Sequence, residues 1–134
     1  MSVFFDSSAL LALHVESAVR PLVRDALERA EQWSACALAL GEAIAAIARL
    51  TDEEILRRHL EDRVRHSWDF FHVVPVDQAL LDDAAALCQL QPVGYSAALH
   101  LSAAARLPGP VEFVTLESSQ IPVAMAMGFS VVSG

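Results

Sequence analysis

Short apolar runs alternate along the chain with longer amphipathic stretches, a pattern that predicts strands separated by helices. Val3-Phe4-Phe5 favours a strand that ends at Asp6, and Ser7-Ser8 offers N-cap residues for a helix directly after it. Pro108-Gly109-Pro110 ends the last long helical stretch. Strands are expected at residues 3–5, 33–37, 72–74, 113–115 and 129–132. The pattern therefore indicates five short strands.

Helices are expected between these strands, at residues 9–15, 17–31, 38–50, 54–71, 77–89, 95–107 and 118–127. In the fourth helix, which Thr51-Asp52-Glu53-Glu54 caps, apolar spacing predicts a buried stripe at Leu56, Leu60, Val64, Ser67-Trp68 and Phe71. Strands that alternate with helices imply a mostly parallel sheet covered on both faces. We therefore expect one α/β domain over residues 1–134, built as a three-layer sandwich around a central parallel sheet.

Composition supports a folded protein without a membrane span. Hydrophobic residues make up 54% of the 134 positions, which excludes the disordered class. No apolar stretch reaches the roughly 18 residues that a transmembrane helix needs. The N-terminus has no positively charged start, its first charge being Asp6, so we expect a cytoplasmic protein. Cys36 and Cys88 are isolated in apolar surroundings and are interpreted as buried reduced thiols, since no cluster typical of zinc surrounds them.

The charge pattern excludes several kinds of chemistry. The net charge is −8, which disfavours a module that grips nucleic acid through a basic face alone. All nine basic residues are Arg, so the Lys of a P-loop and the amine of a Schiff-base enzyme are missing. Ser-Ser-Ala-Leu follows the first strand where a dinucleotide-binding fold would carry glycines. A metal ion or Arg must therefore handle any phosphate.

Three carboxylates stand out because their surroundings are apolar. Asp6 closes the first predicted strand, Glu117 follows the strand at residues 113–115, and Glu42 is the sole charge in an alanine-rich helix. Sites in open parallel sheets form outside the carboxyl ends of the strands, where two of these residues fall. A buried carboxylate needs compensation, and hard oxygen ligands select Mg²⁺ or Mn²⁺ over zinc. These positions predict a shared cation.

Each carboxylate also has an ordinary structural interpretation. Asp6 is placed as an N-cap or turn former would be, and Glu117 as an acid at a helix start. Glu42 could cap a helix or face solvent. Only their joint placement at one edge of the sheet favours a site, so both interpretations stay open at this point.

Several stretches, in order, are similar to those of PIN-domain proteins. The resemblance rests on residues 2–10 with Asp6, 39–43 with Glu42, 97–103 (Ala-Ala-Leu-His-Leu-Ser-Ala), 113–117 (Phe-Val-Thr-Leu-Glu) and 124–132. It implies strand order 3-2-1-4-5 and an endoribonuclease that uses Mg²⁺ or Mn²⁺. It also implies a VapC-type toxin with an antitoxin partner, an RNA substrate that is single-stranded or structured, and a homodimer. Metal-binding and catalytic roles are then expected at Asp6, Glu42 and Glu117, with Ser8 and Ser96 in support.

The chain departs from the family pattern at two positions. Ala97 stands where the family has its third acid, and Glu117 replaces an Asp, which keeps the charge and adds one methylene of reach. The loss at Ala97 weakens the expected cation cage. The alternative function is therefore a catalytically impaired PIN domain that acts as an RNA- or protein-binding subunit.

Other polar and aromatic residues are better explained by structure than by function. Arg57, Arg58, Arg63 and Arg65 could contact an RNA backbone, but Glu54–Arg58, Glu61–Arg65 and Asp62–His66 have the spacing of ion pairs within one helix. His100 lies in an apolar helix and is interpreted as a core histidine. Tyr95 and Trp68 are interpreted as packing residues.

Overall fold

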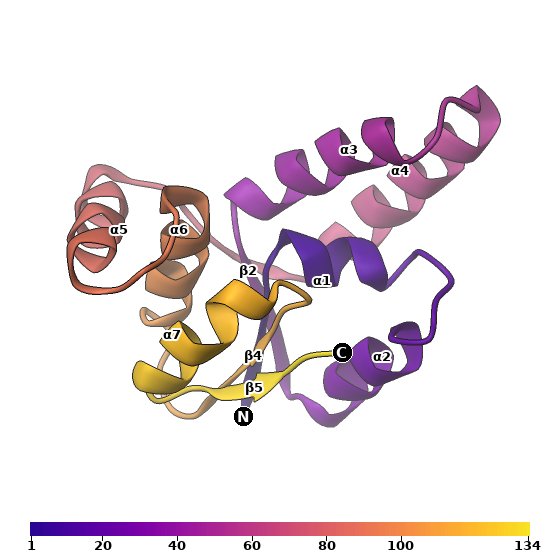
Figure 1. Cartoon of the computed structure of the whole chain (residues 1–134). Coiled ribbons are helices and arrows are strands. Elements are labelled where there is room, and N and C mark those ends of the chain that lie inside the picture. Colours follow the sequence, from indigo (N-terminus) through magenta and orange to yellow (C-terminus); the bar gives the residue numbers. More distant parts are fainter.

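Five strands and seven α-helices alternate along the computed structural model, which describes residues 1–134 (Figure 1). The strands are β1 (Ser2–Phe5), β2 (Gln32–Cys36), β3 (His72–Val74), β4 (Val111–Val114) and β5 (Ser130–Val132). The helices are α1 (Ser7–Ala12), α2 (Arg20–Arg29), α3 (Leu38–Leu50), α4 (Glu54–Trp68), α5 (Gln78–Leu90), α6 (Tyr95–Ala104) and α7 (Ile121–Ala126), with a 3-10 helix η1 (Ser118–Gln120) before α7. Every predicted strand is present.

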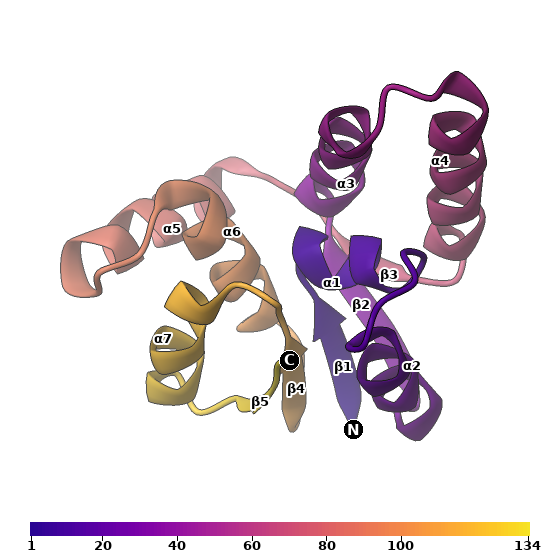
Figure 2. The ribbon, with the colours of Figure 1, turned by 45° about the vertical axis from the view of Figure 1, so that its right-hand side comes forward.

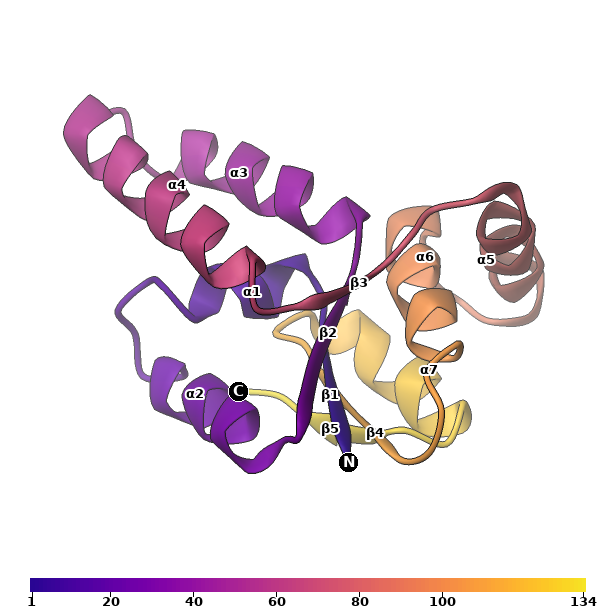
Figure 3. The same cartoon turned by 180° about the vertical axis from the view of Figure 1, so that it is seen from behind.

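All strands run parallel in the order β3-β2-β1-β4-β5, which confirms the expected sheet. The side chains of β1 alternate between two cores, as strand geometry requires. Val3 and Phe5 belong to a core formed with α1 to α4, whereas Phe4 belongs to a core formed with α5, α6 and α7. Figure 3 shows β2 and β3 passing between the α3–α4 pair and the α5–α6 pair. The sheet is thus covered on both faces.

The register brings the carboxyl ends of the three central strands to one edge of the sheet. Phe5, the last residue of β1, is level with Ala35 of β2 and with Val114 of β4. Asp6 therefore emerges beside Thr115, and α3 begins shortly after β2 at the same edge. In Figure 2, α1 and α3 rise from this edge of the sheet. Residues far apart in sequence can meet there.

Several predicted boundaries and one predicted core residue differ from the structure. α1 ends at Ala12, α2 runs only from Arg20 to Arg29, and the last helical stretch begins as the 3-10 turn η1. The predicted buried stripe of α4 is correct at Leu60 and Val64, but Leu56 is 41% exposed and its assignment was wrong. Leu56 lies near the start of α4, where the helix extends beyond the body that it covers (Figure 1).

The two cysteines differ in burial, and only one of them is buried as expected. Cys36 is buried and Cys88 is half-buried, and both thiols are free. Burial raises the pKa of the Cys36 thiol, which keeps it protonated. No helix combines the length and the apolar character that crossing a membrane requires.

Candidate active site

Asp6 is 1% exposed and accepts hydrogen bonds at both carboxylate oxygens. Its Oδ1 accepts from the Ala9 backbone N–H at 2.9 Å and from Ser8 Oγ at 2.7 Å. Its Oδ2 accepts from Thr115 Oγ1 at 2.5 Å and from Gln120 Nε2 at 3.1 Å. The contact with Ala9 caps α1, so the N-cap interpretation of Asp6 is confirmed. Four donors compensate a carboxylate that no basic side chain pairs.

Glu42 lies on the first half of α3 and is held by two residues of α6. His100 Nε2 donates to Glu42 Oε1 at 2.6 Å, and Ser96 Oγ donates to Oε2 at 2.5 Å. The hydrogen bond from His100 holds the pKa of Glu42 below its usual value, against the burial that raises it, and the bond from Ser96 lowers it further. Glu42 is therefore ionised and fixed in place at neutral pH.

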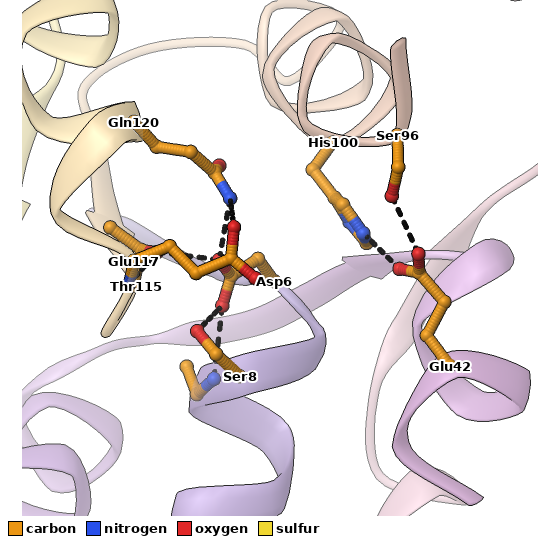
Figure 4. Close-up of polar contacts among 9 residues, drawn as sticks. Asp6, Ser8, Glu42, Ser96, His100, Thr115, Glu117 and Gln120 are labelled. Atoms are coloured by element: carbon orange, nitrogen blue, oxygen red, sulfur yellow. Dashed lines mark hydrogen bonds and ion pairs between the residues drawn. The ribbon is translucent and has the colours of Figure 1, made fainter. Parts of the chain in front are cut away.

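Glu117 is exposed and is connected to Asp6 through Gln120. The buried Gln120 side chain donates from Nε2 to Asp6 Oδ2 and to Glu117 Oε2, the second at 3.2 Å. The backbone N–H of Glu117 also donates to Thr115 Oγ1 at 3.0 Å. Figure 4 shows these contacts as one group around Asp6, with the Glu42 group beside it.

A cavity of about 460 Å³ lies between α1, α3 and the segment that follows β4. Its lining comes from Ser7, Ser8 and Leu11 of α1, from Glu42, Ala45, Ala46 and Arg49 of α3, and from Glu117. Glu42 and Glu117 thus line one cavity, and Asp6 is linked to it through Ser8 and Gln120. The three predicted carboxylates lie at one edge of the sheet, and two of them line this cavity.

The three carboxylates do not form a closed metal cage. No group of three or more Asp, Glu, His or Cys side chains is arranged to hold a metal ion. Mg²⁺ seldom needs a closed cage of protein ligands, because it keeps several waters and is bound by one or two carboxylates together with substrate phosphates. Glu42 and Glu117 offer hard oxygen atoms to one roomy cavity. The chemistry of these oxygen donors therefore fits a hydrated divalent cation in the cavity, with Asp6 as a buried negative charge nearby.

Three residues at this site were missed or underrated by the sequence analysis. Thr115 and Gln120 both bind Asp6, and His100, interpreted as a core histidine, is indeed 1% exposed but also holds Glu42. Gln120 lies three residues after Glu117, where a helical turn places it on the same side. That spacing was the only signal in the sequence that pointed to it.

The predicted supporting serines both contact predicted carboxylates. Ser8 Oγ donates to Asp6 and accepts from the Leu116 backbone N–H at 2.9 Å, which joins α1 to the end of β4. Ser96 lies next to Ala97, and its hydroxyl binds Glu42. Ala97 itself is half-buried and adds no ligand atom.

A family model described as PIN domain matches residues 3–111 of the chain. No curated protein matches the chain significantly. The match covers well over half of the sequence and includes β1, α3 and the start of β4.

Solved structures from three bacteria share this fold over nearly their whole length. A toxin–antitoxin complex from Klebsiella pneumoniae is 19% identical with a TM-score of 0.72, covering 97% of this chain and 95% of the other. FitAcB from Neisseria gonorrhoeae is 14% identical with a TM-score of 0.74, covering 97% and 96%. VapBC2 from Rickettsia felis, bound to a DNA fragment from their promoter, is 8% identical with a TM-score of 0.68, covering 100% and 99%. At these identities the likeness concerns the fold.

Proposed function

The chain belongs to the PIN domain family, and on that premise we propose that it is a metal-dependent endoribonuclease, the toxin component of a toxin–antitoxin pair. PIN domains are generally nucleases, and PIN-domain nucleases generally use divalent metals. The observation that carries the proposal is the cavity lined by Glu42 and Glu117 at the carboxyl edge of the sheet. Parallel sheets place their active sites at this edge.

The chain's own residues would prepare the site for a phosphodiester. His100 and Ser96 hold Glu42 ionised at the cavity wall, and Gln120 orients Glu117 from behind. The negative charges of Glu42 and Glu117 would repel RNA on their own, so a cation at this cavity would strengthen substrate binding. A divalent cation supplies Lewis acidity, which lowers the pKa of a water for attack on phosphorus and neutralises the leaving oxygen.

The proposed partners follow from the fold comparison and from the acidic cavity. The similar structure from Klebsiella pneumoniae is a toxin–antitoxin complex, which supports an antitoxin partner for this chain. RNA, single-stranded or structured, is the proposed substrate. A homodimer in the cytoplasm completes the proposal.

The first prediction concerns the carboxylates. Glu117→Gln removes one charge from the cavity and leaves an exposed residue of the same shape, so Mn²⁺ affinity and RNA cleavage should fall at least tenfold. Asp6→Asn removes the buried charge behind the cavity and should lower both as well. Isothermal titration with Mn²⁺ and a gel assay on a mixed RNA pool measure these effects.

Glu16→Gln is the matched control, because Glu16 is exposed and lies outside the cavity. Cleavage that survives EDTA, or that Asp6→Asn and Glu117→Gln leave intact, would show the metal nuclease proposal to be wrong. Thermal unfolding of Asp6→Asn tells a loss of chemistry from a loss of fold, since Asp6 also caps α1.

A second candidate function is a PIN domain that binds RNA or protein without cutting. Two observations favour it: Ala97 provides no carboxylate, and hydrogen bonds already engage Asp6 and Glu42. Ala97→Asp, next to Ser96, distinguishes the candidates. If the natural chain binds no metal and Ala97→Asp does, the protein is a binding subunit. If both bind metal and the variant cleaves faster, the enzyme proposal stands.

A further inference from the structure

One face of α3 forms the floor of the cavity and carries opposite charges at its two ends. Glu42, Ala45, Ala46 and Arg49 all line the cavity. Their spacing of three, four and seven residues places them on a single helical face. At a rise of ~1.5 Å per residue, Glu42 and Arg49 lie about 10 Å apart along the helix axis. Between them the two alanines leave a floor without side-chain obstruction.

The guanidinium of Arg49 is free to bind a ligand. Arg49 is exposed on the last turn of α3 and takes part in no ion pair or side-chain hydrogen bond. Four other arginines are already held in ion pairs with carboxylates: Arg29, Arg58, Arg65 and Arg106. Arg49 is also the only basic residue in the lining of this cavity. It thus brings a positive charge to a cavity that is otherwise acidic.

We infer that Arg49 binds a phosphate of single-stranded RNA that neighbours the phosphate to be cleaved beside Glu42 and Glu117. This inference rests on the proposed function and adds a second phosphate subsite to it. An extended strand lying across Ala45 and Ala46 brings its next phosphate toward Arg49, and the fork of guanidinium donors matches phosphate oxygens. The backbone of a single strand can adapt its path to this floor, so a single-stranded oligonucleotide is the substrate with which the inference is tested.

Arg49 is therefore a substrate-binding residue, and its removal should weaken binding more than chemistry. The test uses the full chain carrying Glu117→Gln, which slows cleavage of the labelled RNA, at an Mg²⁺ concentration high enough to offset the variant's weaker metal affinity. Fluorescence anisotropy with a single-stranded oligonucleotide in Mg²⁺ then gives the affinity. Adding Arg49→Gln should weaken binding about tenfold, the effect of one charge-assisted hydrogen bond. The slope of log affinity against log salt should fall by about 0.7, the value for one phosphate of a single strand.

Arg57→Gln in the same background is the matched control. Arg57 is exposed on α4, forms no ion pair and does not line the cavity, so its removal should leave affinity and slope nearly unchanged. Ala45→Leu tests the path over α3, since a leucine at this exposed helical position suits the fold but obstructs the floor. It should weaken binding of the oligonucleotide as well.

Substrate length gives a readout that does not depend on the Glu117→Gln background. With the otherwise natural chain, Arg49→Gln should raise KM for a trinucleotide and leave kcat almost unchanged. A dinucleoside monophosphate has no second phosphate, so the same variant should cleave it with the parental kcat/KM. A variant effect of equal size on both substrates would overturn the inference.

The outcomes separate the inference from the function on which it rests. RNA that binds equally well with and without Arg49 overturns the phosphate subsite and leaves the proposed nuclease untouched. RNA that none of the chains binds, with no cleavage by the natural protein, overturns both. Weaker binding on Arg49→Gln, a lower salt slope and an unchanged Arg57→Gln together support the subsite.

Discussion

Asp6 shows how a single residue combines structure and chemistry. Its carboxylate is buried without a basic partner. Two hydrogen-bond donors from the start of α1 and two from the segment after β4 compensate the charge. Removing one donor from such a buried ion costs about 1–3 kcal/mol or more, because the charge cannot regain water. Asp6 is therefore a cap for α1 and a fixed negative charge in the same position. One role does not exclude the other.

His14 makes stability depend on pH. Ser67 Oγ donates to the Val64 carbonyl at 3.0 Å, so it accepts the hydrogen of His14 Nε2 at 2.7 Å. The other ring nitrogen, Nδ1, is buried without a partner, so it has no acceptor for an added proton. Burial first, and then the charges of Arg63, Arg20 and Arg24, lower the pKa of His14 from 6.5 to about 4.

The predicted consequence is a loss of stability in mild acid. Between pH 6.5 and about 4 the unfolded chain binds a proton at His14 and the folded chain does not, so the free energy of unfolding falls as the pH falls. His14→Gln should reduce the slope of the unfolding free energy against pH by up to the contribution of one bound proton. Urea unfolding above and within this window measures it. His59→Gln, at an exposed position on α4, is the control, and an equal effect of both variants would refute the assignment.

The sequence predicted the charged residues of the candidate site better than the neutral ones. A lone acid among Ala, Leu and Ile is conspicuous, which is why Glu42 stood out before its contacts were known. Thr115 and Gln120 are common polar residues whose role depends on a contact with Asp6 more than 100 positions away. His100 was interpreted as a core residue because its sequence neighbours are apolar, whereas its contact with Glu42, 58 positions away, leaves no local pattern.

At the scale of elements, helix and strand types were predictable and exposure was not. Periodicity gave the five strands and the exact span of α3, Leu38–Leu50, because alternation and helical spacing are local. Leu56 has the same spacing as Leu60, yet only Leu60 packs under the body of the protein. Burial along α4 depends on where its neighbours end, which no local pattern contains.

This difference within α4 gives a paired prediction. Leu60→Ala should destabilise the protein by about 2–5 kcal/mol, because Leu60 is 7% exposed and its removal leaves a cavity in the core. Leu56→Ala should cost about 1 kcal/mol or less, because Leu56 is 41% exposed. Chemical unfolding of both variants measures the two changes. Similar losses would mean that the start of α4 is covered in solution.

At the scale of the whole molecule, apolar surface remains after both cores are built. Ile55 is 80% exposed, Leu90 79%, Phe70 64% and Met125 62%. Apolar side chains that stay exposed on a monomer can be covered when two copies associate, if they gather into a patch. We therefore expect a homodimer, in agreement with the family resemblance. Light scattering at high micromolar concentration should give twice the 14.5 kDa of one chain, and a monomer there would contradict the expectation.

The central position of β1 has a consequence for the newborn protein. Asp6 is synthesised 109 positions before Thr115 and 114 positions before Gln120. At roughly 5–20 residues per second, that delay lasts roughly 5–25 s. During this time β1 lacks its β4 neighbour, and Asp6 lacks two of its four donors. Any activity that depends on the complete set of Asp6 contacts therefore begins only after Thr115 and Gln120 have been translated.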